Sequence, residues 1–249
     1  MDNIKVRNYN KDGYCIVRNL LETNQLKQLN KKINNFFKNK SNKLKGKDIN
    51  FTQNKINSIH DIDKFDSYFK KISKNKKIIK IVKTIINSKV EFRKAEIFAK
   101  PAKFGLPSPF HQDNFYWAVK NNNALTIWVA LDKSNKKNGG VTYFKGSHKF
   151  GIVKHVDSNA PGSSQKIDQK VLKKYKYLKK ITPSLNPGDA LIHHCLTFHG
   201  SSVNTTRKNR LGFTMQFKEK NALYDKKQIK YYKQKLQQQI LKRKKKNFL

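Results

Sequence analysis

Cysteine is nearly absent from this sequence of 249 residues. The two cysteines, Cys15 and Cys195, are 180 positions apart, which excludes a CxxC zinc or redox motif and a disulfide scaffold. A reducing cytoplasm is therefore the expected location. No run of about 18 apolar residues occurs, so no segment is expected to span a membrane. The opening residues have no apolar stretch behind a basic start, so no signal peptide is expected.

Acidic residues are also scarce, with 16 Asp and Glu against 55 Lys and Arg, for a formal net charge of +39. One interpretation is a polyanionic partner such as nucleic acid. The other is compositional bias, because the excess consists of 49 lysines and only 6 arginines, spread along the chain with 27 asparagines. Proteins that read nucleic acid favour arginine for bidentate contacts. We favour compositional bias, and nucleic acid stays a disfavoured alternative partner.

Apolar residues at 37% and aromatic residues at 11% are enough to build a buried core. The first part of the chain favours helices. Leu26, Leu29, Ile33 and Phe36 recur at spacings of three and four, which predicts a helix over residues 22–38. A similar pattern predicts helix over residues 61–87, whereas residues 40–60 are polar and irregular.

Short segments rich in β-branched and aromatic residues follow, bounded by turn signals such as Asn186-Pro187-Gly188-Asp189. They predict strands at 89–99, 110–117, 124–131, 141–145, 178–182, 189–194, 196–200 and 210–217, with an inserted loop at 157–177. Many short strands of this kind form a sandwich or a barrel. We expect one mainly β domain with flanking α-helices over residues 1–249. It comprises a helical N-terminal part (1–88), a β-core (89–218) and a basic C-terminal helix (219–249). The sequence indicates no oligomeric state.

The segment Pro109-Phe110-His111-Gln112-Asp113 places an imidazole and a carboxylate two residues apart. On a strand, such residues point to the same face, so one metal ion could bind both. His199 is the candidate third ligand. Two histidines and one carboxylate form the facial triad of non-heme Fe(II) oxygenases.

A second H-x-D motif occurs at His155-Val156-Asp157. The number of residues between each motif and His199 decides which motif is the ligand pair, because a closed β-core needs several strands between the first ligand pair and the last ligand. Asp113 and His199 are 86 residues apart, whereas Asp157 and His199 are 42 residues apart. We therefore expect His155 and Asp157 to be loop residues.

Arg210 opens the apolar strand 210–217, eleven residues after His199. Arginine is rare in this chain, and its guanidinium can grip a carboxylate through two parallel hydrogen bonds. A dicarboxylate bound to the metal at its other end would supply that carboxylate. Arg207 is the alternative, but it lies in a polar turn and is expected to face solvent.

HQD at 111–113, H-G-S-x-x-N at 199–204 and Arg210 together resemble the phytanoyl-CoA dioxygenase family of Fe(II)/2-oxoglutarate oxygenases. Other segments also fit, and the resemblance covers residues 10–218. The further segments that fit are Asp12-Gly13-Tyr14, Lys100-Pro101, Trp128 within ALTIWVALD, Asn138-Gly139-Gly140, Gly146-Ser147-His148 and Asn186-Pro187-Gly188-Asp189. The resemblance implies a double-stranded β-helix (jelly-roll, cupin-like) core.

The resemblance also implies site roles. His111, Asp113 and His199 would bind Fe(II), and Arg210 with Ser201 would bind the distal carboxylate of 2-oxoglutarate. Trp128 would line that pocket. Gln112 and Lys55 are further cofactor-binding candidates. Tyr116, Trp117 and Gln216 are candidates for the substrate wall, and one of His193 and His194 is expected to face the pocket in a structural role.

The implied activity is a dioxygenase reaction that uses Fe(II), 2-oxoglutarate and O2, hydroxylates a small organic substrate and releases succinate and CO2. Related halogenating enzymes lack the carboxylate, so the presence of Asp113 favours hydroxylation. Two alternatives remain: an oxygenase of the same type acting on nucleic acid, and a non-catalytic cupin-like binding protein.

Overall fold

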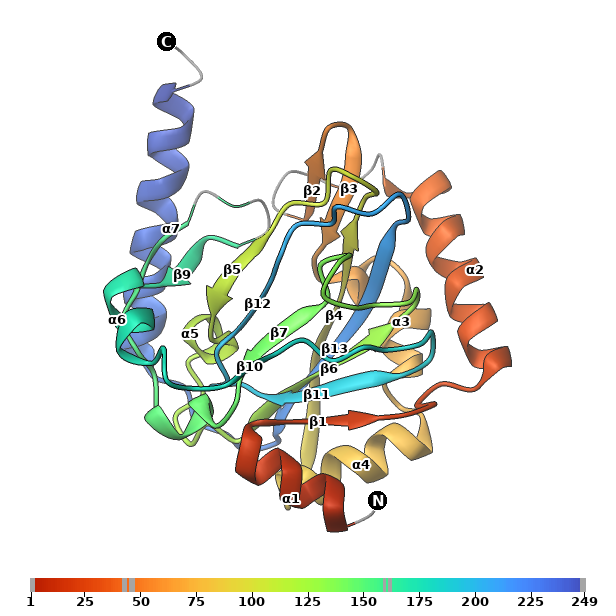
Figure 1. The fold of residues 1–249 in the computed structure, drawn as a ribbon, viewed down its shortest axis with the longest axis horizontal. Helices are drawn as coiled ribbons and strands as arrows, with labels where there is room; N and C mark the ends of the chain where they lie inside the picture. Colours follow the sequence, from red (N-terminus) through yellow and green to blue (C-terminus); the bar gives the residue numbers. More distant parts are fainter. Residues whose placement is uncertain (1–2, 42–43, 45–47, 159, 161–162, 247–249) are drawn as a thin grey trace.

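The computed structural model describes residues 3–41, 44, 48–158, 160 and 163–246. A seven-stranded antiparallel sheet forms the centre of the fold, with strand order β1-β11-β6-β13-β4-β3-β2 (Figure 1). Its strands are β1 (Tyr14–Val17), β2 (Ile49–Thr52), β3 (Lys55–Ile59), β4 (Val90–Lys100), β6 (Ala124–Ala130), β11 (Ala190–His194) and β13 (Arg210–Glu219).

A second antiparallel sheet of four strands has the order β10-β7-β12-β5, and a small ribbon pairs β8 with β9. These strands are β5 (Ser108–His111), β7 (Val141–Phe144), β8 (His155–Asp157), β9 (Gln165–Ile167), β10 (Lys180–Ile181) and β12 (His199–Ser201). The described helices are α1 (Asn3–Asp12), α2 (Thr23–Asn39), η2 (Ile62–Lys64), α3 (Ser67–Ile72), α4 (Lys76–Ile86), α5 (Asp113–Trp117), η3 (Ser147–Phe150), α6 (Gln169–Lys174) and α7 (Lys226–Lys246).

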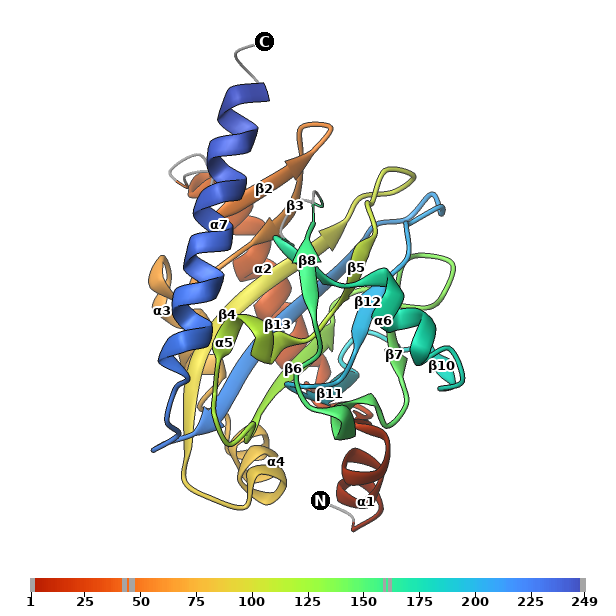
Figure 2. The same cartoon turned by 90° about the vertical axis from the view of Figure 1, so that its left-hand side faces the viewer.

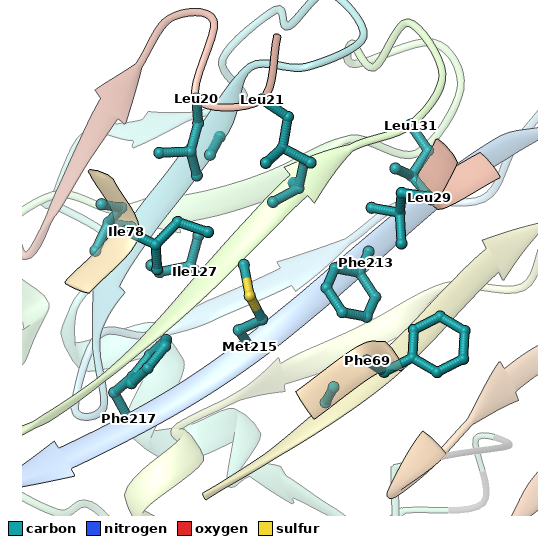
Figure 3. Packing of buried hydrophobic residues seen from close by; sticks show 14 of the residues in the cluster. Leu20, Leu21, Leu29, Phe69, Ile78, Ile127, Leu131, Phe213, Met215 and Phe217 are labelled. Carbon is teal, nitrogen blue, oxygen red and sulfur yellow. The ribbon is translucent and has the colours of Figure 1, made fainter. Parts of the chain in front are cut away.

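The main hydrophobic core lies between one face of the large sheet and the N-terminal helices. Phe213, Met215 and Phe217 alternate along β13 and pack against α2, α3 and α4, which contribute Leu29, Phe69 and Ile78 (Figure 3). Because strand residues alternate between faces, Arg210, Thr214 and Gln216 point to the opposite face. That opposite face meets the four-stranded sheet, and the candidate site lies there.

The last helix, α7, lies at the edge of the molecule, and its last turns reach past the sheets (Figures 1 and 2). It docks on α5, where Nε2 of Gln228 donates to the carbonyl of Phe115 at 3.0 Å. The rings of Tyr232 and Tyr116 meet edge to face with centroids 5.3 Å apart. None of the described helices has the length and apolarity needed to cross a membrane.

The predicted mainly β class with flanking helices is confirmed, and most predicted strands are present. The strand predicted at 110–117 is wrong beyond His111, because α5 occupies Asp113–Trp117 and Ala118 follows it in a left-handed conformation. The helix predicted at 61–87 divides into η2, α3 and α4. The side chain of Asn75 accepts from Lys77 N and Ile78 N, which starts a new helix.

Four further regions differ from the sequence prediction. Residues 3–12 form α1, and the polar stretch 40–60 contains the edge hairpin β2–β3, so the N-terminal part is not purely helical. The predicted loop 157–177 contains β9 and α6. His155 and Asp157 belong to β8 rather than to a loop. The strands among these elements, β2–β3 and β8–β9, are formed by pairing between short segments, which local periodicity does not reveal.

Truncation of Phe213 should test the core. Its side chain is fully buried, so Phe213→Ala should lower the free energy of unfolding by about 3–5 kcal/mol through lost burial and an internal cavity. Urea denaturation followed by circular dichroism measures this. Tyr177→Ala is the control, because Tyr177 is 68% exposed and its loss should change stability by less than about 0.5 kcal/mol. Equal losses for the two variants would contradict this packing.

Candidate active site

A cavity of about 830 Å³ lies between the two sheets. The large sheet lines it with residues of β4, β6, β11 and β13, and the small sheet with residues of β5 and β12. All three predicted metal ligands line this cavity, together with Arg210.

His111, Asp113 and His199 converge at one point. His111 ends β5 and pairs across the small sheet with His199, which begins β12, while Asp113 begins α5. Oδ1 of Asp113 lies 3.8 Å from Nε2 of His111 and 3.6 Å from Nε2 of His199. One ligand atom from each residue lies within 4.8 Å of the others, in the single such group in the described part of the chain. Two imidazole nitrogens and one carboxylate fit a non-heme ferrous ion.

Hydrogen bonds orient both histidines. Nδ1 of His111 donates to the carbonyl of Pro109 at 2.8 Å, and Nδ1 of His199 donates to the carbonyl of Thr197 at 2.9 Å. A neutral imidazole with its proton on Nδ1 leaves the Nε2 lone pair free. Both lone pairs are therefore available on the side where Asp113 lies.

The carboxylate of Asp113 is held from its other oxygen. Thr126 Oγ1 donates to Oδ2 at 2.6 Å, and Nε2 of His193 lies 3.2 Å from the same atom. Nδ1 of His193 is in turn 2.9 Å from the hydroxyl of Tyr143. Oδ1 is left facing the two ligand histidines. Partners of this kind fix a metal ligand in place.

The protonation states follow from burial and neighbouring charges. Burial, followed by the charge of His199, lowers the pKa of His111 to about 4. Burial and His193 lower the pKa of His199 to about 4. Burial alone would raise the pKa of Asp113, but the neighbouring histidines hold it well below its usual range. At neutral pH the site therefore has two neutral imidazoles and one carboxylate, as a divalent cation requires.

Arg210 is buried in the same cavity with little to neutralise it. Among the described residues its guanidinium donates only to the carbonyls of Phe98 (3.3 Å) and Gly139 (3.1 Å), and its Nε has no partner. Burial lowers the pKa of Arg210 to about 9, and burial with the nearby Arg210 charge lowers that of Lys100 to about 6. A buried cation of this kind needs an anion.

Trp128 forms one wall beside Arg210. Its ring centroid lies 5.3 Å from Cζ of Arg210, which is a cation–π contact. Gly212 lies directly beneath the indole, because a Cβ atom at position 212 would come within 2.1 Å of Cζ2 of Trp128. Ser201 lines the cavity on the opposite sheet.

The structure does not bring every predicted site residue to the cavity. Lys55 is exposed on β3, with Nζ 5.9 Å from the ring centroid of Phe104. Gln112 is buried facing away, since its side chain bonds the backbone of Gly151, Val153 and Leu196. By contrast, the three substrate-wall candidates do line the cavity: Tyr116, Trp117 and Gln216.

The second H-x-D motif is separate from the metal ligands. Nε2 of His155 accepts from the backbone nitrogen of Gln112, and its ring stacks on Phe115 with centroids 4.1 Å apart. Asp157 accepts from the side chain of Gln165. Of the two adjacent histidines, His193 lines the cavity and His194 packs against His148 and Tyr9.

Sequence reasoning missed several residues that support the site. Thr126 and Tyr143 hold the ligand shell, and Glu96 and Lys100 line the cavity from β4. Each lies on a strand other than β5, which carries His111. Alternation along a predicted strand could have indicated which face each occupies, but strand order is needed to bring them together.

Comparisons with known proteins agree with this geometry. Residues 9–212 match the family model described as phytanoyl-CoA dioxygenase. Phytanoyl-CoA dioxygenase domain-containing protein 1 homolog of Caenorhabditis briggsae is 28% identical over 174 residues, covering 65% of this chain and 58% of the relative. A probable alpha-ketoglutarate-dependent hypophosphite dioxygenase of Stutzerimonas stutzeri is 25% identical over 137 residues, covering 53% and 46%. The chain thus spans less than two thirds of these relatives.

Solved structures show the same fold. EctD from S. alaskensis with 2-oxoglutarate and 5-hydroxyectoine superposes with a TM-score of 0.76 at 18% identity, covering 90% of this chain and 78% of EctD. The carbocyclase SnoK from nogalamycin biosynthesis gives 0.75 at 18% identity, covering 90% and 86%. The predicted jelly-roll core is confirmed by these likenesses.

The two H-x-D motifs can be separated by experiment. His111→Ala should weaken binding of Co(II), a spectroscopic substitute for Fe(II), by more than about 100-fold, because the loss of even an outer partner costs about 10–100-fold. Asp157→Ala is the control, because Asp157 is the exposed carboxylate of the second motif, and this variant should bind Co(II) as the wild type does. Titration by absorbance, on variants with native circular dichroism, measures both. An equal loss in Asp157→Ala would contradict the assignment.

Proposed function

The chain belongs to the phytanoyl-CoA dioxygenase family, and we propose that it is an Fe(II)- and 2-oxoglutarate-dependent dioxygenase that hydroxylates a small organic molecule with release of succinate and CO2. One observation carries this proposal. A candidate set of three metal ligands shares one cavity with a buried arginine, whose guanidinium donates only to backbone carbonyls within the described part of the chain.

His111, Asp113 and His199 would hold the metal through Nε2, Oδ1 and Nε2. A ferrous ion bound there supplies the activation of O2 and the oxidation of the co-substrate and substrate. The protein positions its ligands through the carbonyls of Pro109 and Thr197, so that no ligand must reorient when the metal binds.

Arg210 would bind the distal carboxylate of 2-oxoglutarate, with Ser201 beside it and Trp128 as the wall. The guanidinium supplies a fork of donors, and its unpartnered Nε is available for the carboxylate. The low exposure of Arg210, 3%, excludes the water that would otherwise screen this ion pair.

The substrate would lie on the other side of the metal, near Tyr116, Trp117 and Gln216. The hydroxyl of Tyr116 donates to the carbonyl of Gln165 at 2.8 Å, which turns the ring toward the cavity and fixes it. Tyr232 and Leu236 of α7 line the same region. The C-terminal helix, which lies outside the matched family region, therefore shapes this substrate pocket.

The free thiols of Cys15 and Cys195 are both buried, and the cytoplasmic location remains a prediction from cysteine usage.

Succinate release tests the proposed activity. Wild-type protein with Fe(II) and 2-oxoglutarate should release succinate in the presence of O2, slowly alone and faster with members of a metabolite library. His111→Ala should release none above background, because the metal site is lost. Succinate and CO2 are measured directly. Without release under any of these conditions, the non-catalytic cupin-like binding protein becomes the better assignment. Stimulation by DNA alone would favour the nucleic-acid alternative.

Arg210→Ala tests the co-substrate pocket. Loss of the buried charged contact should weaken 2-oxoglutarate binding by about 2–5 kcal/mol. Calorimetry without O2, with Mn(II) in place of Fe(II), measures this. Arg207→Ala is the control, since Arg207 is exposed and should leave the affinity unchanged. Unaltered 2-oxoglutarate affinity in Arg210→Ala would remove Arg210 from the pocket.

A further inference from the structure

A β-bulge places Arg93 in the cavity. β4 and β13 pair with Lys94 opposite Gln216 and Phe92 opposite Phe217, so Arg93 is an extra residue with no partner of its own. Strict alternation from Ala95, which belongs to the helix-covered core, would have pointed residue 93 into that core. Bulges re-aim a side chain in this way, and they occur often beside active sites.

The guanidinium of Arg93 is held in a defined orientation. Its Cζ lies 4.6 Å from the ring centroid of Trp117, and Nη1 donates to Oε1 of Gln216 at 2.8 Å. The amide of Gln216 is fixed in turn, because its Nε2 donates to Oε2 of Glu96 at 2.7 Å. Trp117 ends the five-residue helix that Asp113 begins, so Arg93 lies against the helix that carries a metal ligand.

Two of the carboxylates that line the cavity, Glu96 and Asp61, form ion pairs with residues other than Arg93. Glu96 contacts His60 (2.6 Å) and Lys94 (2.7 Å), and Asp61 contacts Lys64 and Lys94. Among the described residues Arg93 forms no ion pair with these groups, with Asp48 or with Asp113, although all of them line the same cavity. Arg93 is thus an oriented cation with unused N–H donors and no anionic partner among the residues that the structure describes.

Aromatic and aliphatic side chains of α5 and α7 line the same cavity. Tyr116, Tyr232 and Leu236 line the cavity from α5 and α7, and the rings of the two tyrosines meet edge to face. A ligand that fills this region would place its charged group on Arg93 and its hydrocarbon part against these side chains.

We propose that Arg93, supported by Trp117 and Gln216, is a recognition site for an oxyanion group, a carboxylate or a phosphate monoester, on a substrate with an apolar body. The anion site rests on the geometry alone. That its ligand is a substrate rests on the proposed function. Arginine can bind a carboxylate or phosphate through two parallel hydrogen bonds in one plane, whereas lysine cannot.

Equilibrium binding tests the anion site without turnover. Benzoate and phenyl phosphate are the probes, and benzamide is the uncharged counterpart, each titrated by calorimetry into metal-free protein with wild-type circular dichroism. Wild type should bind at least one anionic probe at least about 10-fold more tightly than benzamide. Arg93→Gln should lose that preference, while Arg207→Gln should retain it. Because both arginine variants remove one positive charge, the comparison separates a local contact from the overall field of this basic protein.

Arg93→Lys keeps a charge and an aliphatic stem and is the second variant if Arg93→Gln does not fold. This variant should bind benzoate more weakly than the wild type does. It should still bind benzoate more tightly than it binds benzamide. Two results with the wild type would overturn the proposal: equal binding of benzoate, phenyl phosphate and benzamide, or no binding of either anion. Wild-type affinity for the anionic probes in Arg93→Gln or Arg93→Lys would also overturn it.

A second measurement separates this proposal from the proposed function. Succinate release by the wild type is recorded with organic acids, phosphate monoesters and their neutral esters or alcohols. Stimulation by acids or monoesters, reduced at least about 10-fold in Arg93→Gln at sub-saturating concentration, supports the site and identifies which oxyanion it takes. Stimulation by the neutral compounds alone would overturn it. Absence of succinate release from the wild type refutes the enzyme activity only, because the calorimetric result on Arg93 still decides the anion site.

Discussion

The site depends on keeping one carboxylate ionised inside the protein. Asp113 is 9% exposed, and burial of a charge is costly unless hydrogen bonds and opposite charges compensate for it. Thr126 of β6 and His193 of β11 bind one oxygen, and His111 and His199 of the small sheet face the other. Elements of both sheets must therefore come together before this carboxylate is stable. A divalent cation would complete the same balance.

The sequence predicted those parts of this site that short motifs and residue types indicate. H-x-D and the later histidine identify the candidate ligand triad that the structure brings together, and the rarity of arginine draws attention to position 210. Local patterns failed where the conformation comes from distant contacts. Residues 113–117 look like a strand because they are largely aromatic, but Asn114 N donates to the carbonyl of Cys195 and thereby supports a short helix. Lys55 and Gln112 resembled site residues by their neighbours in sequence, while the fold turns both elsewhere.

The large sheet divides the molecule by chemistry. One face, with Phe213 and Met215, is covered by helices and supplies the hydrophobic burial that stabilises the fold. The other face carries charged and polar groups, from Arg210 at one end of β13 to Gln216 near the other. Two of the six arginines, Arg93 and Arg210, stand over tryptophan rings on this face. At these two positions arginine offers stacking and directional donors that lysine, which carries nearly all of the positive charge of this chain, does not.

The close approach of Gly212 to Trp128 couples two positions that are 84 residues apart in the sequence. Any side chain at 212 would displace the indole, so the glycine can be replaced only if residue 128 becomes smaller at the same time. Paired substitutions at 128 and 212 therefore offer a way to exchange the wall of the pocket without changing Arg210. Among related chains, the sizes of these two residues should vary in opposite directions.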